Sequence, residues 1–550
     1  MADSPHSANC KILERYFPEL GAFRDIQEDA IDRLANGDRI LCLMPTGLGK
    51  SLIYQVAGLR SGRTTLVLSP LVALMDQQAE RLEKRGISAQ PLHGVLSGER
   101  YYRTVRSLFE NEAPQFIFLS PERMFFDGYL EHVLRENRDR VGLVVIDEAH
   151  CISQWGHNFR PAYKAIPAFL RNVFGALDRP PLLCLTATLN PKDQEEIRRD
   201  FGLGGNCLIR SRFLLRDNLN LSFETLKDEE AKRERLGELL TEHRGEKIVV
   251  YAHRIRSEYG TRALAERFRR VGFNCDFFDS QAGDEHRGRV ARDFEEDRLP
   301  IVFATNAFGM GVDISDIRTV IHYLVPESIE QYYQEVGRAG RDGKPSFGRL
   351  LFSEVNLKVR KSMIRSAFPS GTEIRRAYQD KFRPKAKDET ASINPWLDFS
   401  EEAKENVTFH ALVEHRVLQI VTKGLQTIGC FRPVGAEQDE FRKYQESSRV
   451  GSVKIIAQRT GIPIPKIVSN IYKWYDSGVV QMTSVPNKVL FYRSEKELTD
   501  KVLEEIVTDM EEKKRNRLEN FAKLVAMIES GEDPTAAIQN HLEVDVGKGA

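Results

Sequence analysis

The chain has no excess of charge of either sign and no recognisable cysteine framework. Its 80 Lys and Arg residues balance 80 Asp and Glu residues across 550 positions. Charge alone therefore gives no global case for nucleic-acid binding, and any such site must be local. The seven cysteines include no C-x-x-C pair. Their scatter argues against a disulfide framework or a zinc knuckle and is typical of a reducing compartment.

Long apolar runs are also missing. No run approaches the roughly 20 apolar residues needed to cross a bilayer, and the first 17 residues contain no apolar segment of the secretory type. We expect an intracellular protein with no membrane association. A chain of this length is too long for one core and predicts roughly three to four domains.

Short, nearly continuous apolar runs alternate with charged helical stretches between about residues 38 and 355. Such runs are typical of parallel strands that are covered on both faces. The runs fall into two sets, which predicts two tandem α/β domains joined near 208–226. Beyond about residue 355 the runs stop, and a mostly helical region is expected. The first set is 39–44, 64–69, 115–120, 142–147 and 181–186, and the second is 247–252, 275–280, 300–305 and 319–324.

The first apolar run leads into MPTGLGKSLIYQ (44–55), which predicts a strand, a glycine-bearing loop and a helix. Gly47 and Gly49 let backbone N–H groups face phosphates at a helix N-terminus. Lys50 would reach the β- and γ-phosphates, and the Ser51 hydroxyl would bind Mg²⁺. The strict P-loop pattern has glycine where Met44 stands, and the alternative is a tight strand–helix turn. The intact GKS favours phosphate binding.

The run GLVVID (142–147) places Asp147 and Glu148 at a strand end, where open α/β sheets hold their ligands. Asp147 can hold Mg²⁺, and Glu148 can orient and deprotonate an attacking water. The alternative is that these acids only cap the next helix. The upstream P-loop and the downstream LTAT favour the catalytic interpretation.

Several motifs together resemble superfamily 2 helicases, and more narrowly the RecQ family of DNA helicases, over roughly residues 15–355. They are FRDIQ (23–27), the P-loop, LSPLVALMDQQ (68–78), LSPERM (119–124), DEAHCISQWGHNFRP (147–161), TAT (186–188), ATNAFGMGVDISDIRTVIHY (304–323) and QEVGRAGRDG (334–343). The resemblance implies two tandem RecA-like P-loop domains with parallel sheets and an ATP- and Mg²⁺-dependent helicase that moves 3′ to 5′ on single-stranded DNA.

The resemblance also assigns roles to single residues. Gln27, with Arg24 nearby, matches the adenine-reading motif. Arg341 matches the arginine finger that the second domain presents to the γ-phosphate, with Arg338 as its neighbour. The alternative is that both arginines form surface ion pairs. Further residues carried over are Thr46 and Asp313 for the nucleotide, Gln334 for catalysis, and Ser69, Thr186, Thr188 and Thr305 for DNA binding or coupling.

The loop behind the acidic pair carries Trp155, His157, Phe159 and Arg160. Trp155 and Phe159 can stack on bases of any sequence, and Arg160 can bind a phosphate. His157 can relay the loop position to the site. We expect this segment to be a coupling loop, through which DNA binding controls the alignment of Glu148. The alternative is an aromatic cluster packed in the interdomain core.

The C-terminal third differs from the RecQ pattern, because Cys430 is the only cysteine after residue 351. A four-thiolate zinc site cannot be built from one cysteine, so we predict no structural zinc. The segment 513–543 faintly resembles the helical part of the family's zinc subdomain, and an unrelated helical hairpin is the alternative.

The segment 453–493 predicts a winged helix in which Ile467, Ile471 and Trp474 face the core. Lys466, Asn470 and Lys473 then lie opposite, where they suit phosphates or base edges. Protein docking is the alternative role. The predicted domains are 1–210 and 211–355 (the two motor domains), 356–410 (helical linker), 411–500 (winged helix) and 501–550 (helical hairpin).

We expect single-stranded and tailed duplex DNA as partners, with other repair or defence proteins, in the bacterial cytoplasm with the nucleoid or otherwise in a nucleus. An RNA-dependent ATPase or remodeller is one alternative, because superfamily 2 shares the motor motifs. The other is a DNA-bound scaffold that switches shape on ATP and unwinds weakly.

Overall fold

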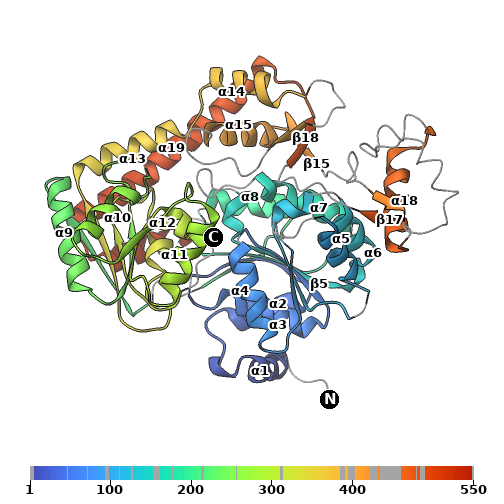
Figure 1. Ribbon diagram of the computed structural model, residues 1–550, viewed down its shortest axis with the longest axis horizontal. Coiled ribbons are helices and arrows are strands. Elements are labelled where there is room, and N and C mark those ends of the chain that lie inside the picture. The colour runs from blue at the N-terminus through green and yellow to red at the C-terminus, as the bar shows by residue number, and fades with distance from the viewer. Residues whose placement is uncertain are drawn as a thin grey trace.

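Two parallel sheets lie side by side, and a helical layer spans them, in a computed structural model of the 550-residue chain (Figure 1). The structure describes residues 5–45, 47–70, 72–92, 98–110, 112–125, 128–152, 161–175, 179–187, 189, 191–211, 216–255, 257–309, 314–384, 391–393, 403–421, 431–433, 460–478, 480–482 and 490–547.

The first sheet has seven strands in the order β3-β4-β2-β5-β6-β1-β7, and all its neighbours pair in parallel. Alternate residues of each strand enter the two opposite cores, with Ile40 and Cys42 in one and Leu41 and Leu43 in the other. The strands are β1 (Arg39–Leu43), β2 (Thr64–Leu68), β3 (Ala89–Leu92), β4 (Phe116–Leu119), β5 (Val141–Asp147), β6 (Leu182–Thr186) and β7 (Leu208–Arg210).

The second sheet has six strands in the order β10-β11-β9-β12-β13-β8, again all parallel. The two parallel sheets confirm the predicted pair of α/β domains. The first sheet ends at Arg210 and the second begins at Leu219, on either side of the predicted boundary. The strands are β8 (Leu219–Thr225), β9 (Lys247–Tyr251), β10 (Cys275–Phe278), β11 (Ile301–Ala304), β12 (Ile317–His322) and β13 (Ser346–Phe352).

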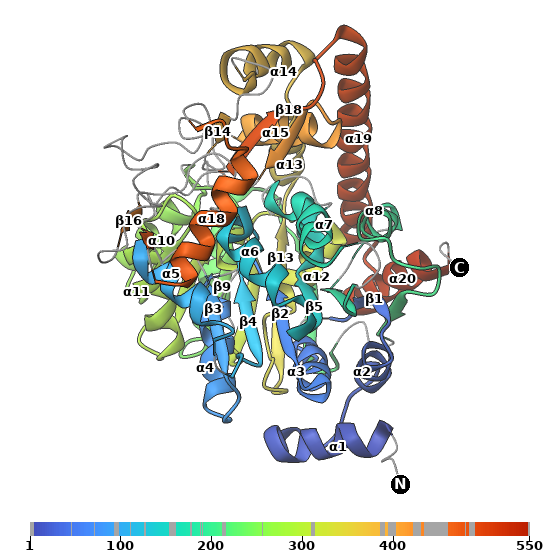
Figure 2. The same ribbon diagram turned by 90° about the vertical axis from the view of Figure 1, so that its right-hand side faces the viewer.

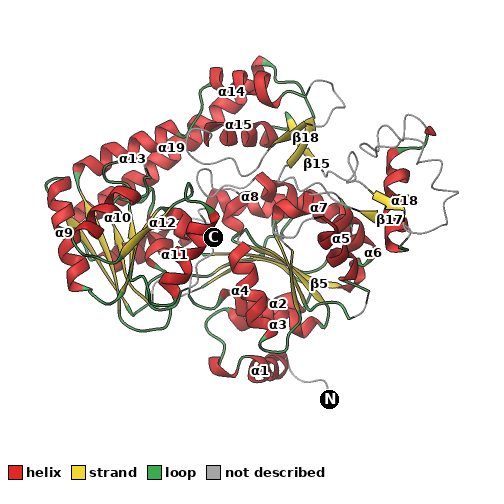
Figure 3. Ribbon diagram, viewed as in Figure 1, coloured by secondary structure: helices red, strands yellow, loops and turns green. Residues whose placement is uncertain are grey.

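Helices cover both faces of each sheet, as the colouring by secondary structure makes plain (Figure 3). In the first domain they are α1 (Pro5–Tyr16), α2 (Gln27–Ala35), α3 (Lys50–Ser61), α4 (Val72–Glu83), α5 (Gly98–Ser107), α6 (Tyr129–Glu136), α7 (Pro161–Phe174) and α8 (Pro191–Phe201). In the second they are α9 (Glu229–Glu242), α10 (Thr261–Arg270), α11 (Asp284–Glu295) and α12 (Ile329–Val336). Shorter helical turns are η1 (Pro18–Leu20), η2 (Pro121–Phe125), η3 (Arg138–Arg140), η4 (Ala149–Ile152), η5 (Asn306–Gly309) and η6 (Tyr378–Phe382). No helix in the described part of the chain is long and apolar enough to span a membrane.

A helical layer follows the second sheet, as predicted for the region beyond residue 355. It consists of α13 (Glu354–Ser366), α14 (Gly371–Ala377), α15 (Ala403–Glu414), α19 (Asp500–Ser530) and α20 (Pro534–Gly547). The 31-residue helix α19 runs along α13 and reaches over both α/β domains (Figures 1 and 2). Ion pairs fix it to each of them, because Arg517 bonds Glu327 in the second domain and Lys192 of the first lies 2.7 Å from Glu512.

Helix α18 (Ile464–Asp476) lies against α5 and α6 of the first domain (Figure 2). The Tyr129 hydroxyl donates to the Asp476 carboxylate at 2.5 Å, and Arg106 donates to the Tyr475 carbonyl at 3.2 Å. The rings of Tyr472 and Tyr475 pack on Tyr129 with centroids 5.1 and 5.3 Å away. The face of α18 that carries Tyr472 and Tyr475 therefore packs on the first α/β domain.

Short antiparallel strands form two small sheets in the C-terminal region. One has the order β14-β18-β15 and the other pairs β16 with β17. Much of 422–459 and 483–489 lies outside the described residues, so the predicted winged helix stays a prediction. The strands are β14 (Ala391–Ile393), β15 (Leu418–Val421), β16 (Phe431–Pro433), β17 (Val480–Met482) and β18 (Leu490–Ser494).

Candidate nucleotide site

Three adjacent strands of the first sheet end at one edge and bring the predicted catalytic elements together. Strand β6 lies between β1 and β5, with Leu43 opposite Thr186 and Leu185 opposite Asp147. The glycine loop after β1, Thr186 at the end of β6 and the acidic pair after β5 are therefore neighbours. This is the carboxyl edge of the sheet, where open α/β folds bind their ligands.

The glycine loop between β1 and α3 is held in a left-handed conformation at two positions. Gly47 has φ +81° and Gly49 has φ +83°, values that residues with a Cβ rarely adopt. A Cβ on Gly49 would lie 2.9 Å from the Gln27 amide nitrogen. The loop leads straight into α3, whose first residue is Lys50. Backbone and lysine are thus placed to bind phosphate.

Gln27 braces this loop from α2. Its side-chain amide donates to the carbonyls of Leu48 and Gly49 at 3.0 and 3.1 Å, while its oxygen accepts from the Arg24 backbone at 2.8 Å. The residue is buried. In this position Gln27 could transmit the binding of a base to the phosphate loop. The adenine contact itself stays a prediction.

The acidic pair and the loop lysine share one half-buried cluster. The Lys50 ammonium lies 3.5 Å from a Glu148 oxygen. Burial and the neighbouring Glu148 charge raise the pKa of Asp147 above its usual range. Burial opposes ionisation of Glu148 too, but the Lys50 charge and His150 outweigh it and hold its pKa well below the usual range. Glu148 has φ +49°, an uncommon backbone state that aims its side chain into this cluster.

His150 links the acidic pair to β6. Its Nδ1 lies 3.1 Å from a Glu148 oxygen and 2.9 Å from the Thr186 hydroxyl oxygen, and all three atoms belong to buried or half-buried side chains. A movement of β6 would therefore shift the imidazole and, with it, the Glu148 carboxylate. The sequence reasoning assigned no role to His150. The signal that could have identified it is its position as the last residue of the DEAH motif.

The second domain presents its arginines to the same loop. Arg338 follows α12 and acts electrostatically on Glu148 across the domain boundary. A Cβ on Gly47 would lie 3.4 Å from Cγ of Arg341. Arg341 therefore lies beside the phosphate loop, and Arg338 lies near enough to Glu148 to stabilise its charge. Gln334, on the last turn of α12, is half-buried beside them.

A third arginine at this boundary was missed by the sequence reasoning. Arg216 precedes β8, and its Nη2 donates to the carbonyls of Gly337 and Ala339 at 2.7 and 2.6 Å. Its guanidinium also faces Gly47 of the phosphate loop. Nothing in the surrounding letters RFLLRDN marked it, because an isolated arginine in a linker has no diagnostic pattern.

Comparison with known proteins agrees with this geometry. A family model described as DEAD/DEAH box helicase matches residues 24–197, and one described as helicase conserved C-terminal domain matches 231–343. The chain is 32% identical over 354 residues to a probable ATP-dependent DNA helicase RecS of Bacillus subtilis, covering 64% of this chain and 68% of the relative. It is 36% identical over 355 residues to the ATP-dependent DNA helicase RecQ of the same organism.

The chain belongs to the RecQ family of helicases. Its match covers 64% of this chain and 57% of the B. subtilis RecQ, so it spans a little over half the length of that relative. Among solved structures, the helicase MrfA bound to DNA and AMPPNP superposes with a TM-score of 0.51 at 19% identity, over 64% of this chain and 52% of that one. This likeness concerns the fold alone.

Several residues expected from the RecQ motifs lie outside the described part of the chain. They are Thr46, Trp155, His157, Phe159, Arg160, Thr188 and Asp313. Ser69 and Thr305 are described and lie at the ends of β2 and β11, where both are buried. Thr305 accepts from the Ala307 backbone at 3.3 Å. Burial suits a coupling role for these two residues better than direct contact with DNA.

The predicted faces of α18 agree in burial with the sequence pattern. Ile467 and Ile471 are fully buried, whereas Lys466 and Lys473 are exposed and Asn470 is half-exposed. The two lysines are open to an anionic partner, but a DNA contact here stays a prediction.

A buried triad of His253, His322 and Glu335 is the cluster in the described residues whose donor atoms converge closely enough for a metal. Both Nε2 atoms approach one Glu335 oxygen, at 3.2 and 2.8 Å. A metal-bound histidine normally donates its other N–H to a partner, and Nδ1 of buried His322 has none among the described residues. Despite burial, the two histidines hold the pKa of Glu335 well below its usual range. The triad therefore fits a His322–Glu335 hydrogen bond and a charge contact from His253 that anchor α12, rather than a metal.

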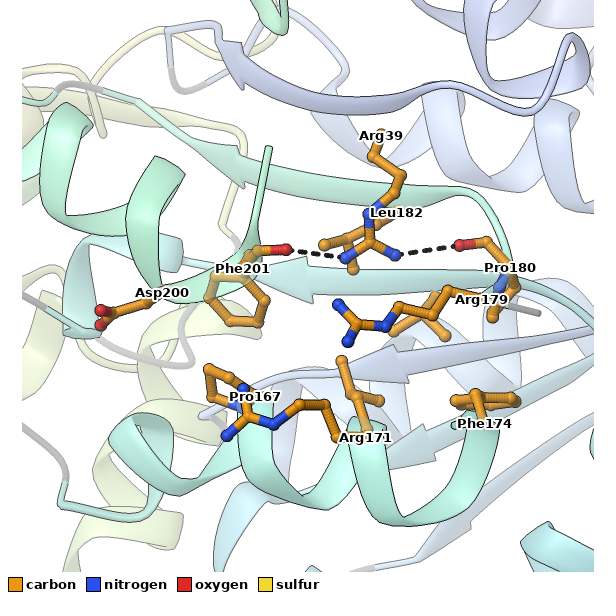
Figure 4. A pocket seen from close by; sticks show the side chains of 11 residues that line it. Arg39, Pro167, Arg171, Phe174, Arg179, Pro180, Leu182, Asp200 and Phe201 are labelled. Carbon is orange, nitrogen blue, oxygen red and sulfur yellow. Dashed lines mark hydrogen bonds between the residues drawn. The ribbon is translucent and has the colours of Figure 1, made fainter. Parts of the chain in front are cut away.

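A surface pocket opens at the opposite end of the first sheet (Figure 4). Arg39 and Leu182, which begin β1 and β6, line it together with Pro167 of α7. The Arg39 guanidinium is already bound to the carbonyls of Pro180 and Phe201, at 3.3 and 2.9 Å. This amino edge lies away from the phosphate loop, so the pocket is separate from the nucleotide site.

Proposed function

We propose that this RecQ-family chain is an ATP- and Mg²⁺-dependent DNA helicase that moves 3′ to 5′ on single-stranded DNA. The single observation that carries the proposal is the approach of the second domain's arginines to the site, with Arg341 beside the phosphate loop and Arg338 acting on Glu148. Such a site is complete only when the two motor domains approach each other. Nucleotide binding and release would therefore move one domain against the other.

The first domain supplies the phosphate and water contacts. Lys50 and the N–H groups of the glycine loop bind the β- and γ-phosphates. Asp147 fits Mg²⁺ because it is a half-buried carboxylate at the end of β5, and the ion pair of Lys50 is formed with Glu148. With Ser51 at the start of α3 it would hold the ion, which neutralises phosphate charge when bound.

Glu148 then orients the water that attacks the γ-phosphate, and Arg338 and Arg341 stabilise the negative charge that develops there. In the free protein the Glu148 carboxylate is paired with Lys50. Phosphate binding would draw Lys50 away and release Glu148 for the water. The Glu148 carboxylate would in this way become available to the attacking water only when nucleotide is bound.

DNA enters this cycle through the loop that follows the acidic pair. Trp155 and Phe159 would stack on bases and Arg160 would bind a phosphate. The His150–Thr186 contact offers a route from DNA-induced movement to Glu148. Single-stranded and tailed duplex DNA are the proposed partners. The proposed location follows the DNA, with the nucleoid in a bacterium or in a nucleus.

Stimulation of ATP hydrolysis by nucleic acid tests the proposal. We expect poly-dT to stimulate the wild-type protein strongly and poly-U much less, and Lys50→Ala to abolish both the basal and the stimulated rate. Stronger stimulation by poly-U would instead favour an RNA-dependent ATPase. A wild-type rate equal to that of Lys50→Ala would refute an ATPase of either kind.

A scaffold that hydrolyses ATP but separates strands weakly is the second candidate. The observation in its favour is that Cys430 is the only cysteine after residue 351, so the family's zinc module cannot form. Hydrolysis without strand displacement on a 3′-tailed duplex would support this candidate.

A further inference from the structure

Arg216 connects the linker between the motor domains to the arginine-bearing turn after α12. Its Nη2 donates to the carbonyl oxygens of Gly337 and Ala339, which flank Arg338. Two short bonds from one nitrogen fix the plane of the guanidinium. They also fix the direction in which its other nitrogen points, because the fork of donors is rigid.

That other nitrogen, Nη1, points at the phosphate loop of the first domain. A Cβ on Gly47 would lie 3.0 Å from it and 3.3 Å from Cζ of Arg216. Nη1 is shielded from solvent and has no hydrogen-bond partner in the part of the chain that the structure describes. A buried donor that is left unbonded is costly, and a donor on a cation more so.

The surroundings of Arg216 are poor in negative charge. Burial and the nearby Arg341 charge lower the pKa of Arg216 to about 10, so it remains a cation at neutral pH. Asp342 is the carboxylate that acts on it, but Arg318 already binds that carboxylate at 2.6 Å. Arg216 thus lies beside Gly47 with its Nη1 donor unbonded among the described residues and with its nearby carboxylate engaged by Arg318.

We propose that Arg216 Nη1 donates to the γ-phosphate of ATP bound in the phosphate loop, as a third arginine beside Arg338 and Arg341. This rests on the proposed function, since it takes ATP as the ligand of the loop. The bound γ-phosphate supplies an acceptor for the buried Nη1 donor of Arg216. Arg216 also pulls the Gly337–Ala339 turn toward the nucleotide, which makes the linker a sensor of the terminal phosphate.

A purely structural role for Arg216 makes a different prediction. The bonds from Nη2 alone would hold the turn, and losing them would act on nucleotide binding only through Arg338. Arg216→Gln would then change the ratio of AMPPNP to ADP affinity no further in an Arg338→Gln background. A contact between Arg216 and the γ-phosphate instead requires the ratio to fall in both backgrounds, because ADP lacks this group.

The experiment measures equilibrium binding of AMPPNP and ADP, each with Mg²⁺, to the full chain and to Arg216→Gln and Arg216→Lys, with Arg216→Gln also made in the Arg338→Gln background. We expect Arg216→Gln to weaken AMPPNP binding by roughly ten- to a hundredfold, the range for a charge-assisted hydrogen bond, and ADP binding by about twofold or less. Arg216→Lys should lose less, because it keeps the charge but not the fork.

Arg318→Gln is the matched control. Arg318 braces the same turn through Asp342 and the Ser346 hydroxyl, but it is not among the residues that approach Gly47. Its variant should keep the wild-type ratio of AMPPNP to ADP affinity, and thermal unfolding should show all variants folded. An unchanged ratio in Arg216→Gln, or a ratio that falls in the wild-type background but not in the Arg338→Gln background, would overturn the γ-phosphate contact.

The binding readout is independent of hydrolysis. If the wild-type protein bound AMPPNP but did not hydrolyse ATP, the proposed function would fail while the ratio still reported on Arg216. If hydrolysis were normal and the ratio did not change, only the inference about Arg216 would fail.

Discussion

The Lys50 ammonium lies 3.5 Å from the Glu148 carboxylate and joins the phosphate loop to the strand that carries the acidic pair. The lysine that should bind phosphate is thus paired with the group that should position water. Nucleotide must replace this ion pair before hydrolysis can begin, so the pair keeps the free site inactive.

Glu148→Gln should separate nucleotide binding from hydrolysis. Glutamine removes the negative charge but keeps the shape, so it frees Lys50 for phosphate while it orients and deprotonates water poorly. We expect ATP affinity to be kept or raised and the turnover rate to fall by roughly 10²–10⁴-fold. Binding of labelled ATP and steady-state hydrolysis provide the two measurements. A variant that hydrolyses at the wild-type rate would remove Glu148 from the chemistry.

Thr186→Val should weaken the response to DNA. The Thr186 hydroxyl lies 2.9 Å from His150 Nδ1, which in turn approaches Glu148. Valine keeps the volume but cannot form this bond, so we expect the DNA-stimulated rate to fall by roughly tenfold, with a smaller loss in the basal rate. Thr319→Val is the control, because Thr319 is a buried strand threonine of the second sheet whose hydroxyl has no partner among the described residues. Equal losses in stimulated and basal rates would argue against a coupling role.

Helix α18 should be held on the first domain partly by one hydrogen bond. The Tyr129 hydroxyl donates to Asp476, and removing either partner should destabilise the docked helix. A double-mutant cycle with Tyr129→Phe and Asp476→Asn should give a coupling free energy of about 1 kcal/mol by denaturant unfolding. Additive losses would mean that the two side chains do not interact in solution.

Removal of divalent metal should stop hydrolysis because Mg²⁺ is lost, and Mg²⁺ alone should restore it. Asp147 and Ser51 fit a hard cation with oxygen ligands, and the cysteine count after residue 351 does not allow a four-thiolate zinc site. We expect EDTA to abolish ATP hydrolysis, Mg²⁺ to restore it fully, and purified protein to hold no stoichiometric zinc by elemental analysis. One tightly held zinc per chain would contradict this.

Trp155→Ala should leave DNA binding largely intact and abolish the stimulation of hydrolysis by DNA. The expectation follows from the position of the aromatic loop directly behind the acidic pair in the sequence. Fluorescence anisotropy with labelled single-stranded DNA and the ATPase rate measured in parallel provide the test. Normal stimulation in this variant would exclude the loop as the route from DNA to Glu148.

The sequence predicted the two parallel sheets because most of their strands are buried on both faces and are almost continuously apolar. The runs missed β3, β7, β8 and β13. Of these, β3, β7 and β8 are edge strands, and β3 contains Pro91. Strand β13 is internal, but its first half alternates buried with half-buried residues. The glycine loop and the acidic pair were predicted from local letters. Arg216 was not, because its role depends on folding the linker against a turn more than 120 residues away.

The docking of α18 illustrates the same limit. The helical pattern correctly placed Ile467 and Ile471 in a core. Tyr472 and Tyr475, which follow Ile471, gave no sign that their face would bind α5 and α6. A contact with a distant part of the chain leaves no periodic signal in one helix. A role for His150 could have been predicted, because it lies in the same motif as Asp147 and Glu148, whose roles were predicted.

Strand separation on tailed duplexes tests the central claim most directly. Wild-type protein with ATP and Mg²⁺ should unwind a 3′-tailed duplex and a fork but leave a 5′-tailed duplex intact, and Glu148→Gln should unwind none of them. Unwinding of the 5′-tailed substrate would contradict the proposed direction. Failure on all three substrates, despite DNA-stimulated hydrolysis, would contradict the assignment as a helicase.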